Sequence, residues 1–377
     1  MGQKTIKKEF EGTSPPAVFI GSKLKYPEVN IGVLSLGEIN EEAWEHNAPN
    51  HWSEKNEKIE RILELRQGLI NSKTRTTVKE IRKNNKLLRK IQEVGMATIK
   101  ADMEIKLKKP PIMKIMKYDQ HVMPIGISAK LESLKEIGNL KIPTPVEKIY
   151  DDTDMKSAEG IMELYKKGFN EQELTQILSI GVTGLGKNRK LVPTRNSITA
   201  VDDLIGRRII KEILNYETID KPRIYQGGHL GNYYTIIMIP GIWNYELFET
   251  SIPSGKTTTD HETHRGRKNY AEETEGGYYA ARIGILEYLK KIKKQATTIL
   301  YRITTPEYTT PLGVWVCRNS VRKALQEEKK EYETNNETIE RARMMTKEKW
   351  GYDIKELINK SKIIKLVRTQ KRITEWF

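Results

Sequence analysis

Hydrophobic side chains recur along this chain at two spacings, one typical of helices and one typical of strands. Apolar residues follow a period of roughly 3.6 within residues 53–72 and 156–180, so each range predicts helix with one buried face. Residues 233–250 are nearly all apolar or β-branched and predict buried strands. Residues 277–294 predict a further helix, opened by two glycines and rich in tyrosine.

The remaining segments are predicted from shorter patterns. Residues 72–97 predict a second helix with an apolar face and a strongly cationic one. Residues 202–216 predict a helix that begins near an acidic cap. Residues 313–317 predict a strand, and residues 319–360 a charged helical hairpin. Strands and helices do not alternate regularly, so the predicted class is α+β: irregular mixed sheets with many helices, a larger N-terminal domain and a smaller, mainly helical C-terminal domain.

The composition of the chain limits the classes of binding partner that we expect. The 377 residues include 65 Lys and Arg against 50 Asp and Glu, a formal net charge of +15 that attracts phosphates and acidic surfaces. No apolar run approaches the ~18 residues of a membrane span, and the N-terminus lacks the apolar region of a secretory signal. We therefore expect a cytoplasmic protein with no membrane partner. The single cysteine, Cys317, excludes an intrachain disulfide and a structural cysteine zinc site.

The positive charge is concentrated between Lys73 and Lys90, where Glu80 is the only acidic residue. A cationic face of this kind can follow a phosphate backbone, each contact releasing a counterion. It can equally serve only to keep the protein soluble. The candidate DNA contacts, from this segment and from later ones, are Lys79, Arg82, Lys83, Lys86, Arg89, Lys187, Arg195, Arg207, Arg265 and Arg267.

Gly181–Asn188 nearly matches the phosphate-binding P-loop. That motif requires a hydroxyl residue after its lysine and a strand before it. Here Asn188 follows Lys187, and the preceding residues predict a helix. We therefore favour a flexible glycine-rich loop, in which Lys187, Arg189 and Lys190 can still contact phosphate.

Residues 260–267 hold the densest cluster of ionisable side chains. His261 and His264 are candidate metal ligands. Carboxylates from this cluster and from residues 202–203 are candidate catalytic groups of a phosphodiester-cleaving centre, which would need a divalent metal: Asp202, Asp203, Asp260 and Glu262. The alternatives are a helix cap at residues 202–203 and a solvated loop at residues 260–267.

The last eight residues carry the most specific pattern. Gln370 is followed at intervals of three and four residues by Ile373, Trp376 and Phe377. This spacing places the three apolar side chains on one side of a single helical turn, which fits a hydrophobic pocket on a partner. The alternative is a terminus that folds back onto its own domain.

The pattern of Gln370, Ile373, Trp376 and Phe377 matches the peptide that binds the sliding clamp PCNA. The rest of the chain resembles the archaeal Nre family of DNA repair proteins through four stretches: EGTSPPAVFIG with YPEVNIG, VPTRNSITAVDDLIG, HRGRKNYAEETEGGYYAARIGILEYL and TPLGVWVCRNSVRKAL. The resemblance implies an N-terminal domain over 1–255, a C-terminal domain over 256–369 and the clamp-binding peptide at 370–377. Some members carry an N-terminal cysteine zinc site, which this chain lacks.

Together these observations favour a DNA repair factor recruited to DNA through the sliding clamp. Two alternatives remain. One is a metal-dependent nuclease or other phosphodiester enzyme acting on damaged DNA, and the other is a non-enzymatic scaffold bound to the clamp. The family brings no catalytic residues that could be assigned to positions of this chain, so whether it is an enzyme stays open.

Overall fold

The computed structural model describes residues 7–111 and 121–369. The chain divides into two compact units. Unit 1 extends to Leu204 and includes Pro311–Gly313, and unit 2 comprises Ile205–Thr310 and the chain from Val314 onward. Helix α7 (Thr194–Ile213) contains the point of division, so the units divide about fifty residues before the domain boundary at residue 255 that the sequence suggests. That boundary stays a prediction.

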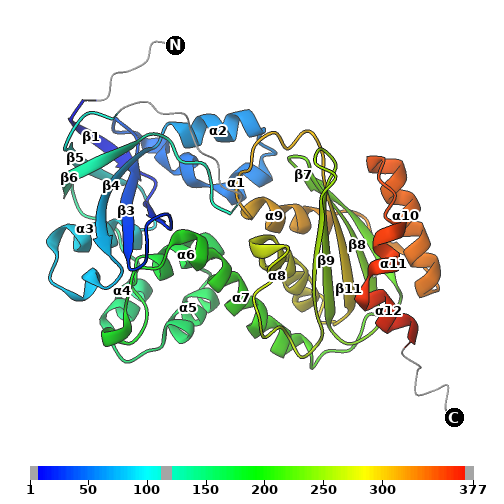
Figure 1. The fold of residues 1–377 in the computed structure, drawn as a ribbon. Coiled ribbons are helices and arrows are strands. Elements are labelled where there is room, and N and C mark those ends of the chain that lie inside the picture. Colours follow the sequence, from blue (N-terminus) through cyan, green and yellow to red (C-terminus); the bar gives the residue numbers. More distant parts are fainter. Residues whose placement is uncertain (1–6, 112–120, 370–377) are drawn as a thin grey trace. The chain divides into compact units, whose positions relative to one another are not determined.

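Unit 1 is built on a six-stranded mixed sheet (Figure 1) with strand order β1-β5-β6-β4-β3-β2, in which β4 and β6 are parallel. The buried residues of β5 alternate along the strand, as expected where one face of a sheet is covered. Helices α3 and α6 pack on β2, and η1 packs on β1. The elements are β1 (Glu9–Ser14), β2 (Ala17–Gly21), β3 (Glu28–Ser35), η1 (Glu41–Asn47), α1 (Pro49–Glu54), α2 (Ile59–Gln67), β4 (Ile70–Thr77), η2 (Glu80–Arg82), α3 (Lys86–Met96), β5 (Ala101–Leu107), β6 (Ser128–Glu136), α4 (Thr144–Asp151), α5 (Ser157–Lys166), α6 (Glu171–Ser179) and η3 (Gly186–Asn188).

Unit 2 contains a second six-stranded mixed sheet, with order β10-β9-β11-β8-β7-β12. Figure 1 shows helices α8 and α9 on one face of it and α10, α11 and α12 on the other. Helices α8 and α9 pack closely, and the absence of a side chain at Gly284 permits this, since a Cβ there would lie only 2.9 Å from Val321 Cγ1. The elements are β7 (Arg223–His229), β8 (Asn232–Ile239), β9 (Asn244–Ser251), β10 (Thr257–Glu262), α8 (Glu275–Lys291), β11 (Thr297–Thr304), α9 (Trp315–Ala324), β12 (Lys330–Glu331), α10 (Asn335–Trp350), α11 (Lys355–Lys360) and α12 (Lys362–Thr369).

The predicted α+β class is confirmed, as are the buried strands of residues 233–250 and the helix that begins near residue 277. The helical range 156–180 is also confirmed, although it is two helices separated at Gly168, whose φ of +91° favours glycine. No helix of the described residues has the length and apolar character needed to cross a membrane.

Three predictions of secondary structure are wrong. The single helix over 72–97 is the end of β4, the short η2 and then α3, because β4 forms a full antiparallel ladder with β3. The strand over 313–317 is the beginning of α9, which is buried against α8 and the sheet. The helix expected from residue 202 begins at Thr194, directly after Pro193, whose carbonyl accepts bonds from Asn196 N and Ser197 N. Asp202 and Asp203 therefore lie inside α7 and are not its cap.

Candidate nucleic-acid interface

Two segments of unit 1, far apart in sequence, meet at the buried residue Val78. The Val78 carbonyl accepts a hydrogen bond from Leu191 N at 2.8 Å, and Arg82 Nε donates to the Arg189 carbonyl at 2.7 Å. Segment 78–86 therefore lies beside segment 187–191.

Glycine at position 181 allows this close approach. Gly181 has a φ of +71°, and a Cβ there would collide with Ile81 Cδ1 and lie 2.7 Å from the Lys190 carbonyl oxygen. The loop that begins at Gly181 follows helix α6, whereas a P-loop requires a strand at that point.

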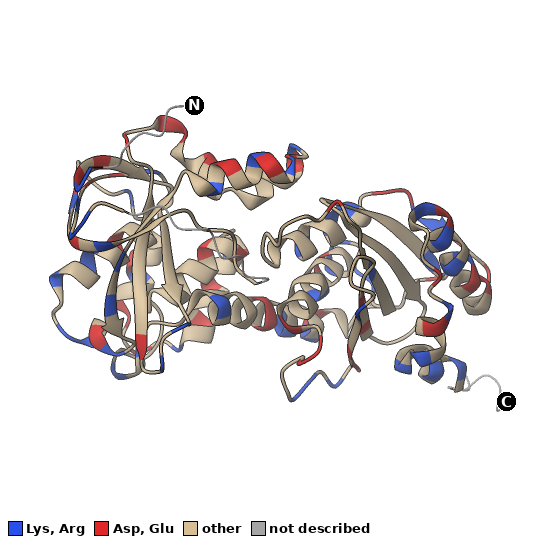
Figure 2. Ribbon diagram, turned by 45° about the horizontal axis from the view of Figure 1, so that its top comes forward, with Lys and Arg blue, Asp and Glu red and all other residues tan. Residues whose placement is uncertain are grey.

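The two adjacent segments present a group of exposed cations, which we call the basic surface of unit 1: Lys79, Arg82, Lys83, Lys86, Lys187 and Lys190. Figure 2 shows the Lys and Arg positions of this region in blue on α3 and on the chain that leads into it. Lys83 Nζ lies 3.1 Å from Glu80, whereas the four other lysines have no carboxylate partner among the described residues. Arg89, further along α3, is exposed and pairs with Glu93 at 3.2 Å. The basic surface thus carries positive charge that the described part of the protein does not neutralise.

Arg189, also predicted to contact phosphate, has a structural role. Its guanidinium donates to the carbonyls of Ile149, Tyr150 and Asp152 at the end of α4, and to Gly184 O. Bonds to the last carbonyls of a helix satisfy acceptors that have no partner within the helix. Burial lowers the pKa of this guanidinium. Arg189 therefore holds the end of α4 beside the loop that carries Lys187 and Lys190.

The other predicted DNA contacts lie elsewhere. Arg195, in the first turns of α7, is half-buried, with Nη2 3.4 Å from His121 Nε2. In unit 2, Arg207 and Arg265 are exposed, and Arg207 Nη2 donates to the Arg267 carbonyl at 3.2 Å. Arg267 turns inward: its guanidinium donates to the carbonyls of His261 and Tyr270 and stands 5.2 Å from the centre of the Tyr278 ring. Its charge is thus used to hold the loop after β10.

The predicted carboxylates of unit 2 are also held by internal partners. Asp260 Oδ2 accepts bonds from Glu273 N, Thr274 N and Thr274 Oγ1 at 2.9–3.1 Å, and Oδ1 lies 2.9 Å from Arg267 Nη2. Glu262 is fully buried and accepts bonds from Arg282 Nη1 at 2.7 Å and Trp243 Nε1 at 3.1 Å. Buried carboxylates with this set of donors stabilise the packing of α8 on the sheet.

His261 and His264, and the aspartates Asp202 and Asp203 of α7, do not form a recognisable metal centre either. Burial, followed by the nearby charge of Lys362, lowers the pKa of His261, and His264 is exposed. Asp202 is buried and Asp203 half-buried, both in unit 1. Across residues 7–111 and 121–369, no group of three or more His, Cys, Asp or Glu side chains is arranged to hold a metal ion. The catalytic and metal-binding roles of these residues stay predictions.

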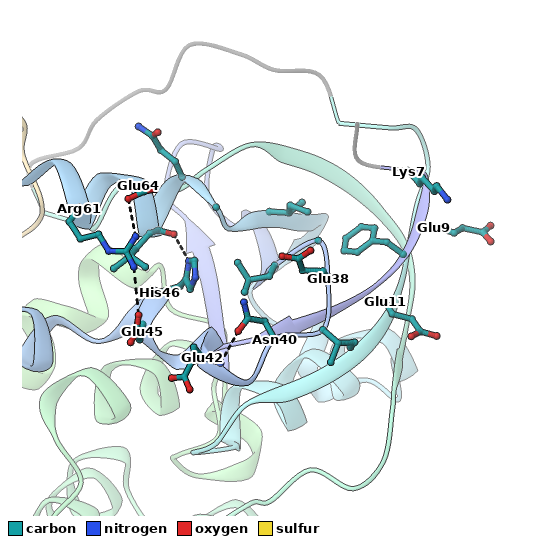
Figure 3. Close-up of a pocket in the computed structure, with 18 residues that line it drawn as sticks. Lys7, Glu9, Glu11, Glu38, Asn40, Glu42, Glu45, His46, Arg61 and Glu64 are labelled. Atoms are coloured by element: carbon teal, nitrogen blue, oxygen red, sulfur yellow. Dashed lines mark hydrogen bonds and ion pairs between the residues drawn. The ribbon is translucent and has the colours of Figure 1, made fainter. Parts of the chain in front are cut away.

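A hollow in unit 1 has a different character (Figure 3). It measures about 1000 Å³ and lies between β1, the loop after β3, η1 and α2. Arg61 pairs with Glu64 at 2.9 Å and with Glu45 at 3.8 Å, and His46 Nδ1 lies 2.6 Å from the Leu65 carbonyl. Burial lowers the pKa of His46, so the ring carries no charge at neutral pH to offset the acids. The remaining lining is rich in glutamate, and this negative charge repels a polyanion.

The last described helix leads directly into the predicted clamp-binding peptide. Helix α12 ends at Thr369, and Gln370, Ile373, Trp376 and Phe377 lie outside the described residues. The buried carboxylate of Glu246, on β9, accepts bonds from Lys362 N at 2.9 Å, Ile363 N at 3.2 Å and the Ser361 hydroxyl. A carboxylate at the first turn of a helix accepts hydrogen bonds from the free N–H groups there, and its negative charge interacts favourably with the positive end of the helix dipole. The start of α12 is therefore firmly attached to the sheet.

The fold and the basic surface define an α+β protein of two compact units that offers exposed charge to a polyanion. The chain belongs to the archaeal Nre family, because the family's N-terminal model matches residues 1–256 and its C-terminal model matches residues 262–376. It is 36% identical to the DNA repair protein NreA of Archaeoglobus fulgidus, over 89% of this chain and 85% of the relative. It is 33% identical to DNA repair protein NreB of the same organism (96% and 91%) and 31% identical to DNA repair protein NreA of Haloferax volcanii (87% and 81%). No solved structure matches the chain.

Proposed function

We propose that this protein is a DNA repair factor that binds DNA phosphates through the basic surface of unit 1 and is recruited to DNA by the sliding clamp through residues 370–377. The names of three relatives, each aligned over most of the chain, support a role in DNA repair. The observation that carries the DNA contact is the set of lysines without carboxylate partners on two adjoining segments.

The charge on this surface suits a phosphate backbone. Lys79, Lys86, Lys187 and Lys190 are exposed, and no described carboxylate lies within ion-pair distance of them. When such lysines neutralise phosphates, cations condensed on the DNA are released, and this release drives binding. Backbone contacts of this kind position a protein on DNA without selecting a sequence.

Recruitment by the clamp would compensate for weak contacts to phosphate. A peptide that binds the clamp converts DNA binding into a local event at a high effective concentration. The motif of Gln370, Ile373, Trp376 and Phe377 supports this part of the proposal, and so does the attachment of α12 by Glu246 immediately before it. The attached helix gives the peptide a fixed starting point.

The DNA contact is tested by salt titration of binding. A variant with Lys79, Lys86, Lys187 and Lys190 each changed to Gln is compared with a control of equal charge, in which Lys55, Lys58, Lys291 and Lys293 are changed to Gln. Fluorescence anisotropy with a labelled 20-base-pair duplex gives the slope of log affinity against log salt between 50 and 200 mM. Each phosphate contact contributes a slope of about 0.9, so the test variant should be shallower by about 3–4.

The control variant decides the interpretation. It should retain the wild-type slope to within about one contact, because none of its lysines belongs to the two segments of the basic surface: Lys55 and Lys58 lie in the loop between α1 and α2, and Lys291 and Lys293 belong to unit 2. Equal loss in both variants would mean that only net charge matters, and an unchanged slope in the test variant would refute the proposed surface.

The clamp contact is tested separately by calorimetry. Trp376→Ala combined with Phe377→Ala should abolish binding to a purified archaeal sliding clamp, because large aromatic anchors dominate such interfaces. Thr374→Ala combined with Glu375→Ala, which leaves the motif intact, should bind like the wild type. Retained affinity in the first variant would overturn the recruitment.

The two alternative functions gain no observation from the structure. An enzyme would use the carboxylates of residues 202–203 and 260–262, of which Asp260 and Glu262 are engaged by arginines and backbone donors. Incubation with damaged DNA, with and without Mg²⁺ or Mn²⁺, would detect such an activity. A scaffold without DNA contact would show no salt-dependent DNA binding in the titration above.

A further inference from the structure

The turn between β2 and β3 presents an aromatic ring to solvent. Tyr26 is 68% exposed, more than any other large hydrophobic side chain that the structure describes. A hydrogen bond from Glu28 N to the Lys25 carbonyl, 3.0 Å long, closes the turn. The two strands that carry it are paired from Ala17 with Leu34 to Gly21 with Asn30. The ring therefore projects from a fixed turn.

This turn adjoins the basic surface of unit 1. Val78 N donates to the Pro27 carbonyl at 2.9 Å, while the Val78 carbonyl accepts from Leu191 N at 2.8 Å. One buried residue therefore joins the turn to both segments that carry the lysines. Strand pairing places Glu28 opposite Thr77, which agrees with this position.

The turn also adds charge. Lys23 and Lys25 are exposed, and neither has a carboxylate partner among the described residues. Glu28, the nearest acid in sequence, is paired with Arg75. Tyr26 is therefore an exposed ring between lysines on one side and the basic surface on the other.

The combination of a ring with surrounding cations favours a particular form of nucleic acid. Bases in a duplex are stacked on one another and leave no face for a protein ring, whereas an unpaired base has two free faces. Proteins that bind single strands combine a cationic track for the phosphates with aromatic rings on which bases stack. A surface that recognised only the duplex backbone would need the lysines but not the exposed ring.

We propose that the basic surface of unit 1 binds DNA with unpaired bases, such as a single strand, a gap or a flap, and that Tyr26 stacks on one of them. This inference rests on the proposed function and specifies its substrate. Lys23 and Lys25 contact the phosphates that flank the stacked base, and the lysines beyond Val78 contact the continuing backbone.

The test compares single-stranded with duplex DNA, using the full chain. Anisotropy measures binding of a labelled 20-nucleotide oligothymidylate and of a 20-base-pair duplex to the wild type and to Tyr26→Ala, Tyr26→Phe and Trp44→Ala. Tyr26→Ala should weaken single-strand binding about 5- to 150-fold, equivalent to about 1–3 kcal/mol, and change duplex binding less than twofold. Tyr26→Phe, which retains the ring, should stay within about threefold of the wild type.

Trp44→Ala controls for the loss of an exposed aromatic elsewhere in unit 1, and should have no effect on either DNA. Equal losses on both DNAs, or no loss on the single strand, would overturn the role of Tyr26. These outcomes are distinct from failure of the proposed function, in which the wild type itself shows no salt-dependent affinity for either DNA. The role of Tyr26 in stacking on a base would also be overturned if Tyr26→Ala lost affinity for an acidic protein but kept its affinity for both DNAs.

Discussion

Replacing Glu262 with glutamine tests whether this carboxylate is structural or catalytic. The side chain is fully buried, and its two oxygens accept from Arg282 Nη1 at 2.7 Å and Trp243 Nε1 at 3.1 Å. The arginine side chain is only 2% exposed and its guanidinium stands 5.2 Å from the centre of the Tyr279 ring. Glutamine preserves the shape and one acceptor but removes the charge that compensates the arginine.

Removing one member of a buried ion pair leaves the other charge unpaired, at a cost of about 3–5 kcal/mol. For a unit of this size, such a loss lowers the midpoint of thermal unfolding by roughly 6–20 °C. Urea denaturation followed by circular dichroism measures the free energy of unfolding of Glu262→Gln, Arg282→Met and the double variant. The double variant should be more stable than the sum of the two single losses predicts, because neither charge remains unpaired.

A loss below about 1 kcal/mol in Glu262→Gln would refute a structural ion pair. If that variant were as stable as the wild type but lost a metal-dependent cleavage of DNA, the carboxylate would be catalytic.

Three further predictions follow from buried contacts. Glu246→Gln should lower the stability of the α12 attachment by about 1–2 kcal/mol, seen as faster amide exchange in its first turn, whereas the exposed Glu356→Gln in α11 should leave exchange unchanged. Gly181→Ala should destabilise unit 1 by roughly 3 kcal/mol, against about 1 kcal/mol for Gly138→Ala, which has a similar φ but open space; equal losses would disprove the close contact. Burial lowers the pKa of His229 to about 4, so its stabilising effect is complete above about pH 6.5 and is lost as the pH falls toward 4. His229→Gln should therefore reduce the loss of unfolding free energy between pH 7 and pH 4 by about 3 kcal/mol, measured by urea denaturation, and an identical pH profile would contradict this.

The elements that could be predicted from sequence are those whose local pattern agrees with their surroundings. The strands within residues 233–250 are mostly apolar because both faces of the sheet in unit 2 are covered. The charges of residues 72–77 fit a cationic helix face and so favour the helix expected over 72–97. Their three threonines are β-branched and favour a strand, and pairing of Thr74 with Ile31 on the neighbouring strand decides the structure.

The beginning of α9 shows the opposite conflict. Val314 and Val316 favour a strand by propensity, but the segment is buried against α8, where Gly284 admits Val321 at close range. Close packing between two helices requires contacts between residues far apart in sequence, which a local pattern does not contain. Tertiary packing therefore overrides propensity at this point.

The candidate site was predictable only as a set of charges. The lysines of residues 79–86 stand out in the sequence, but their proximity to residues 187–191 depends on contacts such as that of Arg82 with Arg189, 107 residues away. Sequence also does not distinguish an arginine that faces solvent from one that holds its own chain together. Arg189 and Arg267 belong to the second kind because each finds several backbone carbonyls within hydrogen-bond distance.

The junction at Val78 has a consequence for the protein during its synthesis. The ribosome synthesises the lysines of residues 79–86 about a hundred residues before Lys187 and Lys190, which lie beside them in the folded protein. Until residues 187–191 have been synthesised and form their hydrogen bonds with Val78 and Arg82, the early lysines are not joined by the later ones in a single surface. Under the proposed function, tight binding of nucleic acid requires the complete unit 1, so an unfinished chain on the ribosome would bind the surrounding RNA less tightly than the folded protein.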